Sequence, residues 1–242
     1  MIKSLSIIFP VYNEELRLKS SFNHIKSFLK KNKKFKTEII FSDDGSQDNS
    51  YNLIAQFIKS FKSNKKNKFK IVKLKKNLGK GAALKMGVKS AKHSWILTSD
   101  IDMSVSLFQF TNWINRKLIN KKNFVYFGSR KHEKSIVKKK IFRNILGNIM
   151  GFLISTVLNI KIKDTQCGYK LYEKRIGKLI FSKLKTFDFN HDLEIILFLK
   201  AKNIKIKELP VKWIHKNNSS LNIFWDPIKM FLGIFKIRLR YF

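Results

Sequence analysis

Residues 95–102 read Trp-Ile-Leu-Thr-Ser-Asp-Ile-Asp, an apolar run that ends in two aspartates two positions apart. The apolar part predicts a buried strand over 95–98, because short apolar runs bounded by polar residues are typical of strands covered on both faces. Alternation along an extended segment would place Asp100 and Asp102 on one side of the chain. The pair therefore indicates a site for Mg²⁺ or Mn²⁺, which prefer oxygen ligands.

Two further apolar runs end in acidic residues. Residues 10–14 (Pro-Val-Tyr-Asn-Glu) follow an expected strand at 5–9, and residues 43–46 (Asp-Asp-Gly-Ser) follow one at 38–41. We also expect strands at 69–74 and 124–127 and helices at 14–29, 48–61, 79–91 and 107–118. This alternation predicts an α/β fold with a mainly parallel sheet and helices on both faces. Ligands bind at the carboxyl ends of such strands, so the three acidic ends predict one cleft for a metal and a phosphorylated ligand.

A glycine-containing segment, Asn77-Leu78-Gly79-Lys80-Gly81-Ala82, opens the helix expected at 79–91. Glycines allow close backbone approach and a helix start favours anions, so the segment resembles a weak phosphate cradle. It is not a Walker motif, because no Ser or Thr follows Lys80. By itself the segment is equally compatible with an ordinary helix start.

Composition restricts the class of protein. A chain of 242 residues with 44% apolar content suits one domain with a substantial core. The net charge of +35 suggests a nucleic-acid partner, but only seven of the 51 basic residues are arginine and the lysines are spread along the chain. We therefore expect no nucleic-acid partner, and expect attraction to an anionic membrane surface. The single cysteine, Cys167, excludes an intramolecular disulfide and fits a reducing compartment.

Two stretches of the second half are strongly apolar. Residues 141–160 contain polar positions that argue against a membrane span, so we expect a helix packed on the core or lying at a bilayer surface. Residues 223–242 mix aromatic and aliphatic residues with Lys and Arg, which is typical of an amphipathic helix at a membrane interface, or of a terminal helix docked on the sheet. We accordingly predict a main domain over 1–222 and a C-terminal amphipathic helix over 223–242.

The order of the segments is more specific than any one of them. Together they resemble glycosyltransferase family 2, in particular its branch of dolichyl-phosphate β-glucosyltransferases and polyprenyl-phosphate glycosyltransferases. The matching segments are residues 10–14, 43–46, 77–81, 100–102, 128–130, 164–171 and 210–213.

This resemblance implies a GT-A fold and a metal-dependent, inverting transfer of a sugar to a polyprenyl or dolichyl monophosphate. It favours glucose from UDP-glucose as the donor, with GDP-mannose or another nucleotide sugar as the alternative. It implies Mg²⁺ or Mn²⁺ at Asp100 and Asp102. We expect a peripheral location at the cytoplasmic face of a membrane, with no membrane span in this sequence. The residues it assigns to the nucleotide sugar are Pro10, Tyr12, Glu14, Asp43, Lys80 and Asp100.

The acceptor side is assigned by the same resemblance. Arg130 and Arg143 match positions near the acceptor phosphate, and a guanidinium binds phosphate oxygens bidentately. Asp192 and Glu194 resemble an Asp-x-Glu helix start near the acceptor, although acidic residues are also favoured at any helix N-terminus. The branch usually carries Gly-Ser-Lys where this chain has Asn-Ser-Ser at 218–220, and Lys216 is a candidate replacement for that lysine.

Two hypotheses from other classes remain at this point. A basic nucleic-acid-binding protein would show clustered basic and aromatic residues, whereas three acidic strand ends favour an enzyme. A non-catalytic membrane-surface protein could retain the same fold, because a fold alone does not decide activity.

Overall fold

The computed structural model describes residues 2–61, 66–120, 123–138, 156–188, 190–216 and 233–240. Its centre is a seven-stranded sheet in the order β3-β2-β1-β4-β7-β5-β8. Neighbouring strands are parallel except for β7, which runs antiparallel to both β4 and β5. A smaller sheet pairs β6 with β9. The strands are β1 (Ser4–Val11), β2 (Lys36–Asp43), β3 (Asn67–Lys73), β4 (Trp95–Thr98), β5 (Val125–Ser129), β6 (Ile136–Lys138), β7 (Lys170–Glu173), β8 (Ile206–Pro210) and β9 (Lys212–Ile214).

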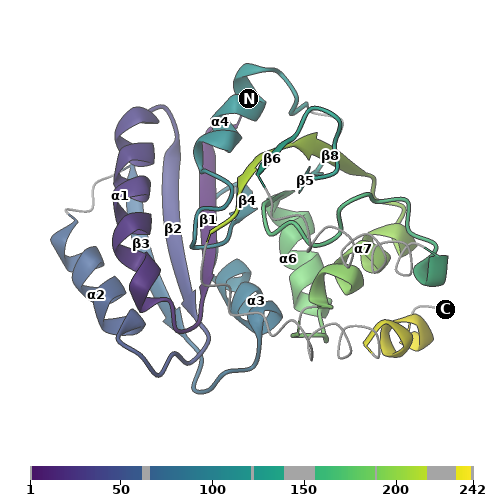
Figure 1. The fold of residues 1–242 in the computed structure, drawn as a ribbon, viewed down its shortest axis with the longest axis horizontal. Helices are drawn as coiled ribbons and strands as arrows, with labels where there is room; N and C mark the ends of the chain where they lie inside the picture. The colour runs from purple at the N-terminus through teal and green to yellow at the C-terminus, as the bar shows by residue number, and fades with distance from the viewer. Residues whose placement is uncertain are drawn as a thin grey trace.

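Helices cover both faces of the large sheet. They are α1 (Glu15–Lys31), α2 (Ser50–Ser60), α3 (Lys80–Ser90), α4 (Phe108–Asn115), α6 (Lys174–Lys183) and α7 (His191–Ala201), and residues 233–240 are also helical. In Figure 1, α1 and α2 lie at one end of the molecule, whereas α6, α7 and the C-terminal helix lie at the other.

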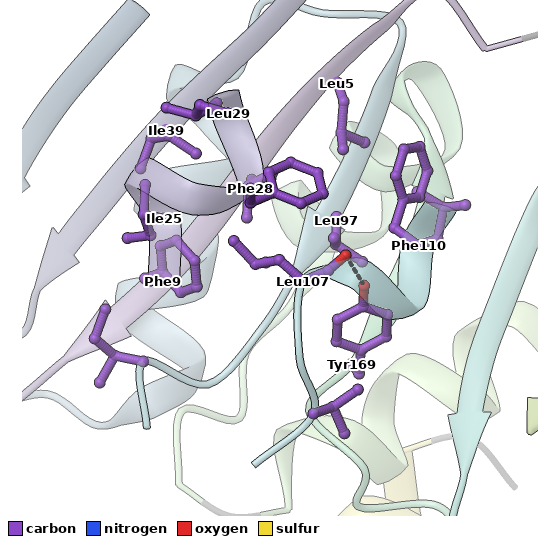
Figure 2. Packing of buried hydrophobic residues seen from close by; sticks show 14 of the residues in the cluster. Leu5, Phe9, Ile25, Phe28, Leu29, Ile39, Leu97, Leu107, Phe110 and Tyr169 are labelled. Carbon is purple, nitrogen blue, oxygen red and sulfur yellow. Dashed lines mark hydrogen bonds between the residues drawn. The ribbon is translucent and has the colours of Figure 1, made fainter. Parts of the chain in front are cut away.

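The apolar residues of the strands are divided between two cores. Ile7 and Phe9 of β1 pack in the core that also contains α1, α2 and α4, and Ile8 packs in the core formed with α3, α6 and α7. Figure 2 shows residues of the first core, among them Phe28 of α1 and Leu97 of β4. Because successive strand residues face opposite sides, a strand buried on both faces needs the continuous apolar run seen in the sequence.

The strands and helices predicted for the first half of the chain are confirmed. The strand expected at 95–98 matches β4, and the other predicted elements differ from the observed ones by a few residues at their ends. The antiparallel strand β7 was not predicted. It is four residues long and mixes Lys170 and Glu173 with two apolar residues, so its sequence carries no distinctive period.

The two apolar stretches of the second half are described only in part. Within 141–160, residues 156–160 are described, and Leu158 and Ile160 pack in the second core. Ile234 and Ile237 of the C-terminal helix are buried in the same core, so this part of the tail is a docked helix. The boundary predicted at residue 222 lies outside the described residues. In the described part of the chain, no helix has the length and apolarity needed to cross a membrane.

Candidate active site

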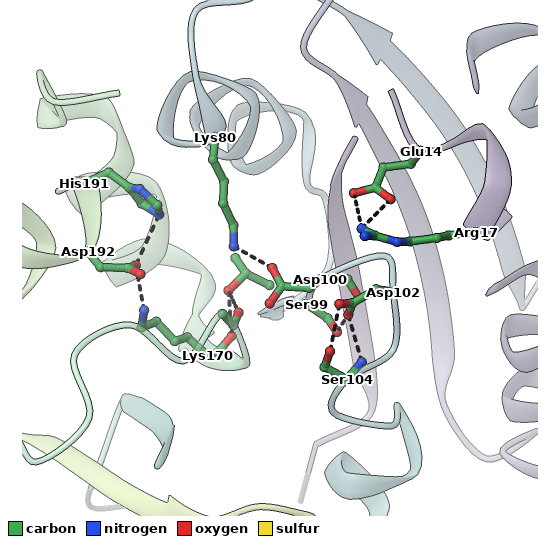
Figure 3. Close-up of polar contacts among 12 residues, drawn as sticks. Glu14, Arg17, Lys80, Ser99, Asp100, Asp102, Ser104, Lys170, His191 and Asp192 are labelled. Atoms are coloured by element: carbon green, nitrogen blue, oxygen red, sulfur yellow. Dashed lines mark hydrogen bonds and ion pairs between the residues drawn. The ribbon is translucent and has the colours of Figure 1, made fainter. Parts of the chain in front are cut away.

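The site is built around Asp100, which follows β4 at the carboxyl end of the sheet. Lys80 at the start of α3 donates to Asp100, with 2.5 Å between Nζ and Oδ1 (Figure 3). Gly168 lies directly against this carboxylate, because a Cβ placed on it would lie 2.5 Å from Asp100 Oδ2. Thr98 donates its hydroxyl to the Gly168 carbonyl at 3.0 Å, so β4 and the segment before β7 are joined beside the carboxylate.

Asp102 has different partners from Asp100. Its Oδ1 accepts from the Ser104 amide at 2.8 Å and its Oδ2 accepts from the Ser104 hydroxyl at 2.7 Å. Residues 100–103 form a turn, in which the Met103 amide donates to the Asp100 carbonyl and Met103 has φ 56°. The expectation of an extended segment is therefore wrong, and the turn rather than strand alternation sets the two carboxylates.

The electrostatics of Asp100 and Lys80 are coupled. Burial alone would raise the pKa of Asp100, but the ammonium of Lys80 holds it below its ordinary value. Burial would lower the pKa of Lys80, but Asp100 and then Asp192 raise it. Both groups are accordingly charged at neutral pH, and Lys80 lies between two carboxylates.

The loop before Lys80 is fixed by Asp44. The carboxylate oxygens of Asp44 accept from the amides of Leu78 at 2.9 Å and Gly79 at 2.8 Å. Gly79 has φ 106°, a conformation that a residue with a side chain rarely adopts, and a Cβ there would lie 2.4 Å from the Phe187 carbonyl oxygen. The amides of Leu78 and Gly79 are thus occupied by Asp44 and not free to bind a phosphate. What the loop shares with a phosphate cradle is the placement of Lys80, which lies beside Asp100.

The loops after β1 and β2 are bound to each other. The Asn13 amide donates to the Ser46 hydroxyl at 3.0 Å, and the Glu14 amide donates to the Ser50 hydroxyl at 2.8 Å. Glu14 also accepts two hydrogen bonds from Arg17. Burial and the negative charges of Asp102 and Asp100 raise the pKa of Glu14, whereas Arg17 lowers it, so Glu14 lies within electrostatic reach of both aspartates.

Asp43 at the end of β2 has an unused oxygen. The residue is fully buried, its Oδ1 accepts from the Ser46 amide at 3.3 Å, and its Oδ2 has no hydrogen-bond partner among the described residues. Its register partner on β1 is Val11, which places Asp43 next to Pro10 and Tyr12. A buried carboxylate oxygen without a donor is costly, so it indicates a place for an external N–H or O–H group.

Arg130 is held rigidly at the end of β5. Its Nε and Nη2 donate to the two oxygens of Asp164, both at 2.7 Å, and its backbone amide donates to Asp164 at 2.8 Å. Asp164 is in turn placed by Glu208 of β8, which accepts from the amides of Lys163 and Asp164. Arg130 also lies over the ring of Trp213, 5.9 Å from its centroid.

A pocket joins this arginine to the first aspartate. Its walls include Asp100, Arg130, Gly168 and Trp213, together with Ser99, Val105, Gln166, Cys167 and Tyr169. Cys167 contributes no nucleophile, because burial and the nearby Asp164 raise the pKa of its thiol to about 12. This agrees with the expectation that Cys167 is a small packed residue.

Asp192 reaches the same region from the start of α7. It pairs with the buried Lys170 of β7, 2.6 Å from Nζ to Oδ1, and His191 Nε2 lies 3.2 Å from the same oxygen. Burial would raise the pKa of Asp192, but His191, Lys170 and Lys80 lower it strongly. Figure 3 shows this pair beside the Lys80–Asp100 pair.

Glu194 does not join this group. Its oxygens accept from the amides of Lys185 and Thr186, the latter at 2.6 Å, and from Arg240 of the C-terminal helix at 3.1 Å. These contacts give Glu194 a clear structural part, which is to bind a loop and the C-terminal helix to α7.

Two expected positions lie outside the described residues. These are Arg143 and the Asn-Ser-Ser segment at 218–220. Lys216 is described and exposed. The pKa of His24 lies below its ordinary value, first because His24 is partly buried and second because Lys216 carries a positive charge.

Sequence reasoning gave no role to Lys170, Asp164 or Gly168. All three lie in the segment 164–171 that carried the resemblance, which was the one available signal. A buried lysine cannot be separated by sequence from the many exposed lysines of this chain, and the Asp164–Arg130 pair joins residues far apart in the sequence.

The side chains at the site provide some of the oxygen ligands that a hard divalent cation needs, but not all of them. Asp100 and Asp102 supply carboxylate oxygens, and each carboxylate retains lone pairs beyond the hydrogen bonds it accepts. No cluster of three or more His, Cys, Asp or Glu side chains suited to a metal occurs among the described residues. A cation here would therefore take its remaining ligands from a bound molecule such as a diphosphate.

Comparisons with known proteins give a consistent result. The family model for "Glycosyl transferase family 2" matches residues 6–181. The chain is 35% identical to the dolichyl-phosphate beta-glucosyltransferase of Dictyostelium discoideum, over 98% of this chain and 74% of that protein. It is 32% identical to the human protein of the same name, over 99% of this chain and 76% of that protein.

A solved structure shares the fold. Glucosyl-3-phosphoglycerate synthase from Mycobacterium tuberculosis, in complex with Mn²⁺, uridine diphosphate and phosphoglyceric acid, superposes with a TM-score of 0.71. The sequence identity is 12%, over 98% of this chain and 78% of that one, so this likeness concerns the fold alone.

Proposed function

The chain belongs to glycosyltransferase family 2, and we propose that it is a metal-dependent, inverting enzyme that transfers glucose from UDP-glucose to dolichyl phosphate or a related polyprenyl monophosphate. The observation that carries this proposal is the pocket shared by Asp100 and Arg130. It places a carboxylate suited to a metal diphosphate beside a guanidinium suited to a phosphate. The names of the relatives at 35% and 32% identity support the choice of sugar and acceptor.

The donor side uses the residues at the ends of β1, β2 and β4. The unpartnered oxygen of Asp43 accepts a hydrogen bond from the nucleotide base, beside Pro10 and the partly exposed Tyr12. Lys80 and Asp100 face the diphosphate, and Glu14 lies behind them. Asp100 and Asp102 would hold a Mg²⁺ or Mn²⁺ ion, which would supply positive charge to stabilise the departing nucleoside diphosphate.

The acceptor side needs orientation more than activation. A phosphate monoester has a second pKa near ~6, so at neutral pH it is largely a dianion and a competent nucleophile. Arg130, fixed by Asp164, orients this dianion in the pocket, and Arg143 is proposed as a second guanidinium. Attack by a phosphate oxygen on the anomeric carbon breaks its bond to the diphosphate, and a single displacement inverts the configuration there.

Asp192 acts from beside the pocket. Its charge is already paired with the ammonium of Lys170, so we assign it to positioning Lys170 and attracting Lys80 rather than to proton transfer. We assign Glu194 to a structural part, because it binds the loop at 185–186 and Arg240.

The enzyme works at a membrane surface, since a polyprenyl phosphate is held in a bilayer. The net charge of +35 attracts anionic headgroups, and the C-terminal helix exposes Leu239 and Phe235 on the side away from the core. We place it as a peripheral protein on the cytoplasmic side, where nucleotide sugars are available as donors.

A panel of radiolabelled nucleotide sugars tests this function. The purified chain is incubated with dolichyl phosphate in detergent, Mg²⁺ or Mn²⁺, and either UDP-glucose or GDP-mannose. We expect label to enter the organic phase from UDP-glucose, in a product whose glucose is β-linked by proton NMR. Label that enters the organic phase only from GDP-mannose would contradict UDP-glucose as the donor and identify GDP-mannose instead. An α-linked product would contradict inversion.

A further inference from the structure

The ammonium of Lys80 pairs with the Asp100 carboxylate, which is also the carboxylate proposed to bind a divalent cation. The ammonium of Lys80 lies 2.5 Å from Asp100 Oδ1, and the two side chains are 29% and 39% exposed. Asp100 is also the residue to which the proposed function assigns the metal. An ammonium in contact with a carboxylate repels a second cation that approaches it, so both cannot bind Asp100 with full strength.

We propose that Lys80 competes with the metal for Asp100, and that the diphosphate of the donor relieves this competition by attracting the ammonium to itself. Metal and nucleotide then bind tightly together and weakly apart. This inference rests on the proposed function, because it needs a diphosphate beside Asp100. It goes further by making Lys80 the group that couples the two ligands.

Of the two carboxylates that the proposed function assigns to the metal, Asp100 is the one for which the described contacts include an ammonium. Glu14 is bound by Arg17, and Asp192 is bound by Lys170. Both oxygens of Asp102 accept hydrogen bonds from Ser104, which leaves its charge without a cationic partner among these contacts. Asp100 is thus the carboxylate whose charge is contested. A diphosphate adds negative charge and oxygen atoms for both cations, so it removes the repulsion that a metal alone would meet.

The surroundings of Lys80 restrict the change to its side chain. The Gly79 amide is bound to Asp44, and the Gly81 amide donates to the Phe187 carbonyl at 2.8 Å. A Cβ on Gly81 would lie 2.8 Å from His191 Cβ, so α3 and the start of α7 are in close contact here. The backbone on both sides of Lys80 is therefore fixed, and the four-carbon stem of the lysine lets the ammonium move between two partners.

Binding of Mn²⁺ followed by electron paramagnetic resonance tests the competition without any transfer reaction. The full chain is titrated with Mn²⁺, with and without UDP, as wild type, Lys80→Met and Lys85→Met. Lys85 is the matched control, since it lies on the same helix and its ammonium donates to the Leu184 carbonyl at 2.7 Å rather than to a carboxylate. A double variant, Lys80→Met with Asp100→Asn, identifies which Mn²⁺ is bound at Asp100.

The proposal expects Lys80→Met to bind Mn²⁺ alone at least about fivefold more tightly than wild type, and UDP to increase its Mn²⁺ affinity by a smaller factor than in wild type. Lys85→Met should match wild type, and the double variant should lose the gain. Lys80→Met that binds Mn²⁺ alone no more tightly than wild type would overturn the competition. A wild type that binds Mn²⁺ and UDP cooperatively but transfers no sugar would instead count against the proposed function.

Discussion

Asp43 and Asp44, at and just after the end of β2, differ in their hydrogen-bond partners. Both carboxylate oxygens of Asp44 accept backbone amides of the loop before α3, although burial raises the pKa of this residue. Asp43 keeps one buried oxygen without a partner among the described residues. The sequence Asp-Asp-Gly-Ser thus combines a residue that fixes the loop with one that we propose binds the donor.

The Asp164–Arg130 pair should contribute stability that depends on pH. Burial would raise the pKa of Asp164, but Arg130 lowers it below the ordinary value of 3.8. A depressed pKa in the folded state adds stability that is present above the ordinary pKa and is lost as the pH falls through the folded one. Asp164→Asn should therefore cost about 3 kcal/mol of unfolding free energy near pH 7, and less as the pH falls below about 4.

Urea unfolding of Asp164→Asn and wild type at several pH values measures this difference. Glu133→Gln is the matched control, since it removes an exposed carboxylate and should leave the unfolding free energy unchanged throughout. A penalty for Asp164→Asn that stays constant down to pH 3 would show that the charge of Asp164 is not its source.

Gly168 should matter for activity more than for stability. A Cβ there would lie 2.5 Å from Asp100 Oδ2, and the end of that side chain would have to move. Displacing a reacting contact by about 1 Å costs up to ~100-fold in rate, so Gly168→Ala should lower kcat strongly with little change in Tm. Gly177→Ala on α6, where a Cβ would lie 3.2 Å from Tyr172 Cβ, is the control and should keep kcat. Equal kcat in both variants would refute the close packing on Asp100.

Single residues of the site were predictable from sequence where they follow an apolar run. Asp43 and Asp100 each follow an apolar run, whereas Lys80 and Arg130 received their roles from the family resemblance, and the structure brings these four to one end of the sheet. Glu194 could not be separated from Asp192 by sequence. Both fall in the first turn of α7, and only the packing of the loop at 185–186 and of Arg240 gives them different surroundings.

At the scale of elements, strands β1 to β5 were predictable, whereas the antiparallel β7 and the parallel β8 were not. The strands β1, β2, β4 and β5 contain apolar runs and are buried on both faces, and the partly buried β3 lies between two helices, which gives a strong pattern. Strand β8 mixes Lys207 and Glu208 with apolar residues and is only partly buried. Strand β7 enters between β4 and β5 from a distant segment, and its place is set by backbone pairing with both. It is nevertheless the element that brings Gly168 and Lys170 to the site.

The C-terminal helix should be both a structural and a membrane-facing element. Ile237 is 1% exposed in the second core, whereas Leu239 is 87% exposed. Ile237→Ala should lower the unfolding free energy by about 2–4 kcal/mol, because it leaves a cavity. Leu239→Ala should leave stability unchanged and weaken binding to lipid vesicles in a flotation assay. Loss of stability in Leu239→Ala, or none in Ile237→Ala, would reverse the assignment of the two faces.

At the scale of the whole molecule, the sheet and the surface charge serve different purposes. The order of β3, β2, β1 and β4 places Asp43, Glu14, Asp100 and the loop that leads to Lys80 at one edge of the sheet, so the fold itself assembles the side proposed to bind the donor. The lysines are spread over the chain and do not define the site.

The spread of charge predicts how the molecule binds membranes. With a net charge of +35, binding to vesicles that contain anionic lipid should weaken steeply as salt rises from 50 to about 500 mM, because screening shortens the reach of exposed charges. Sedimentation with vesicles of neutral lipid alone should show much weaker binding. Salt-independent binding would indicate that apolar contacts, rather than charge, dominate.

Transfer of labelled glucose by wild type and Asp100→Asn tests the central claim most directly, since Asp100 contacts Lys80, lines the pocket of Arg130 and is the proposed metal ligand. Both proteins are assayed with UDP-glucose, Mn²⁺ and dolichyl phosphate, and their melting temperatures are compared. We predict labelled lipid from wild type and at least about a hundredfold lower rate from Asp100→Asn, with the two melting temperatures close together. Equal rates in the two proteins would contradict a catalytic centre at Asp100.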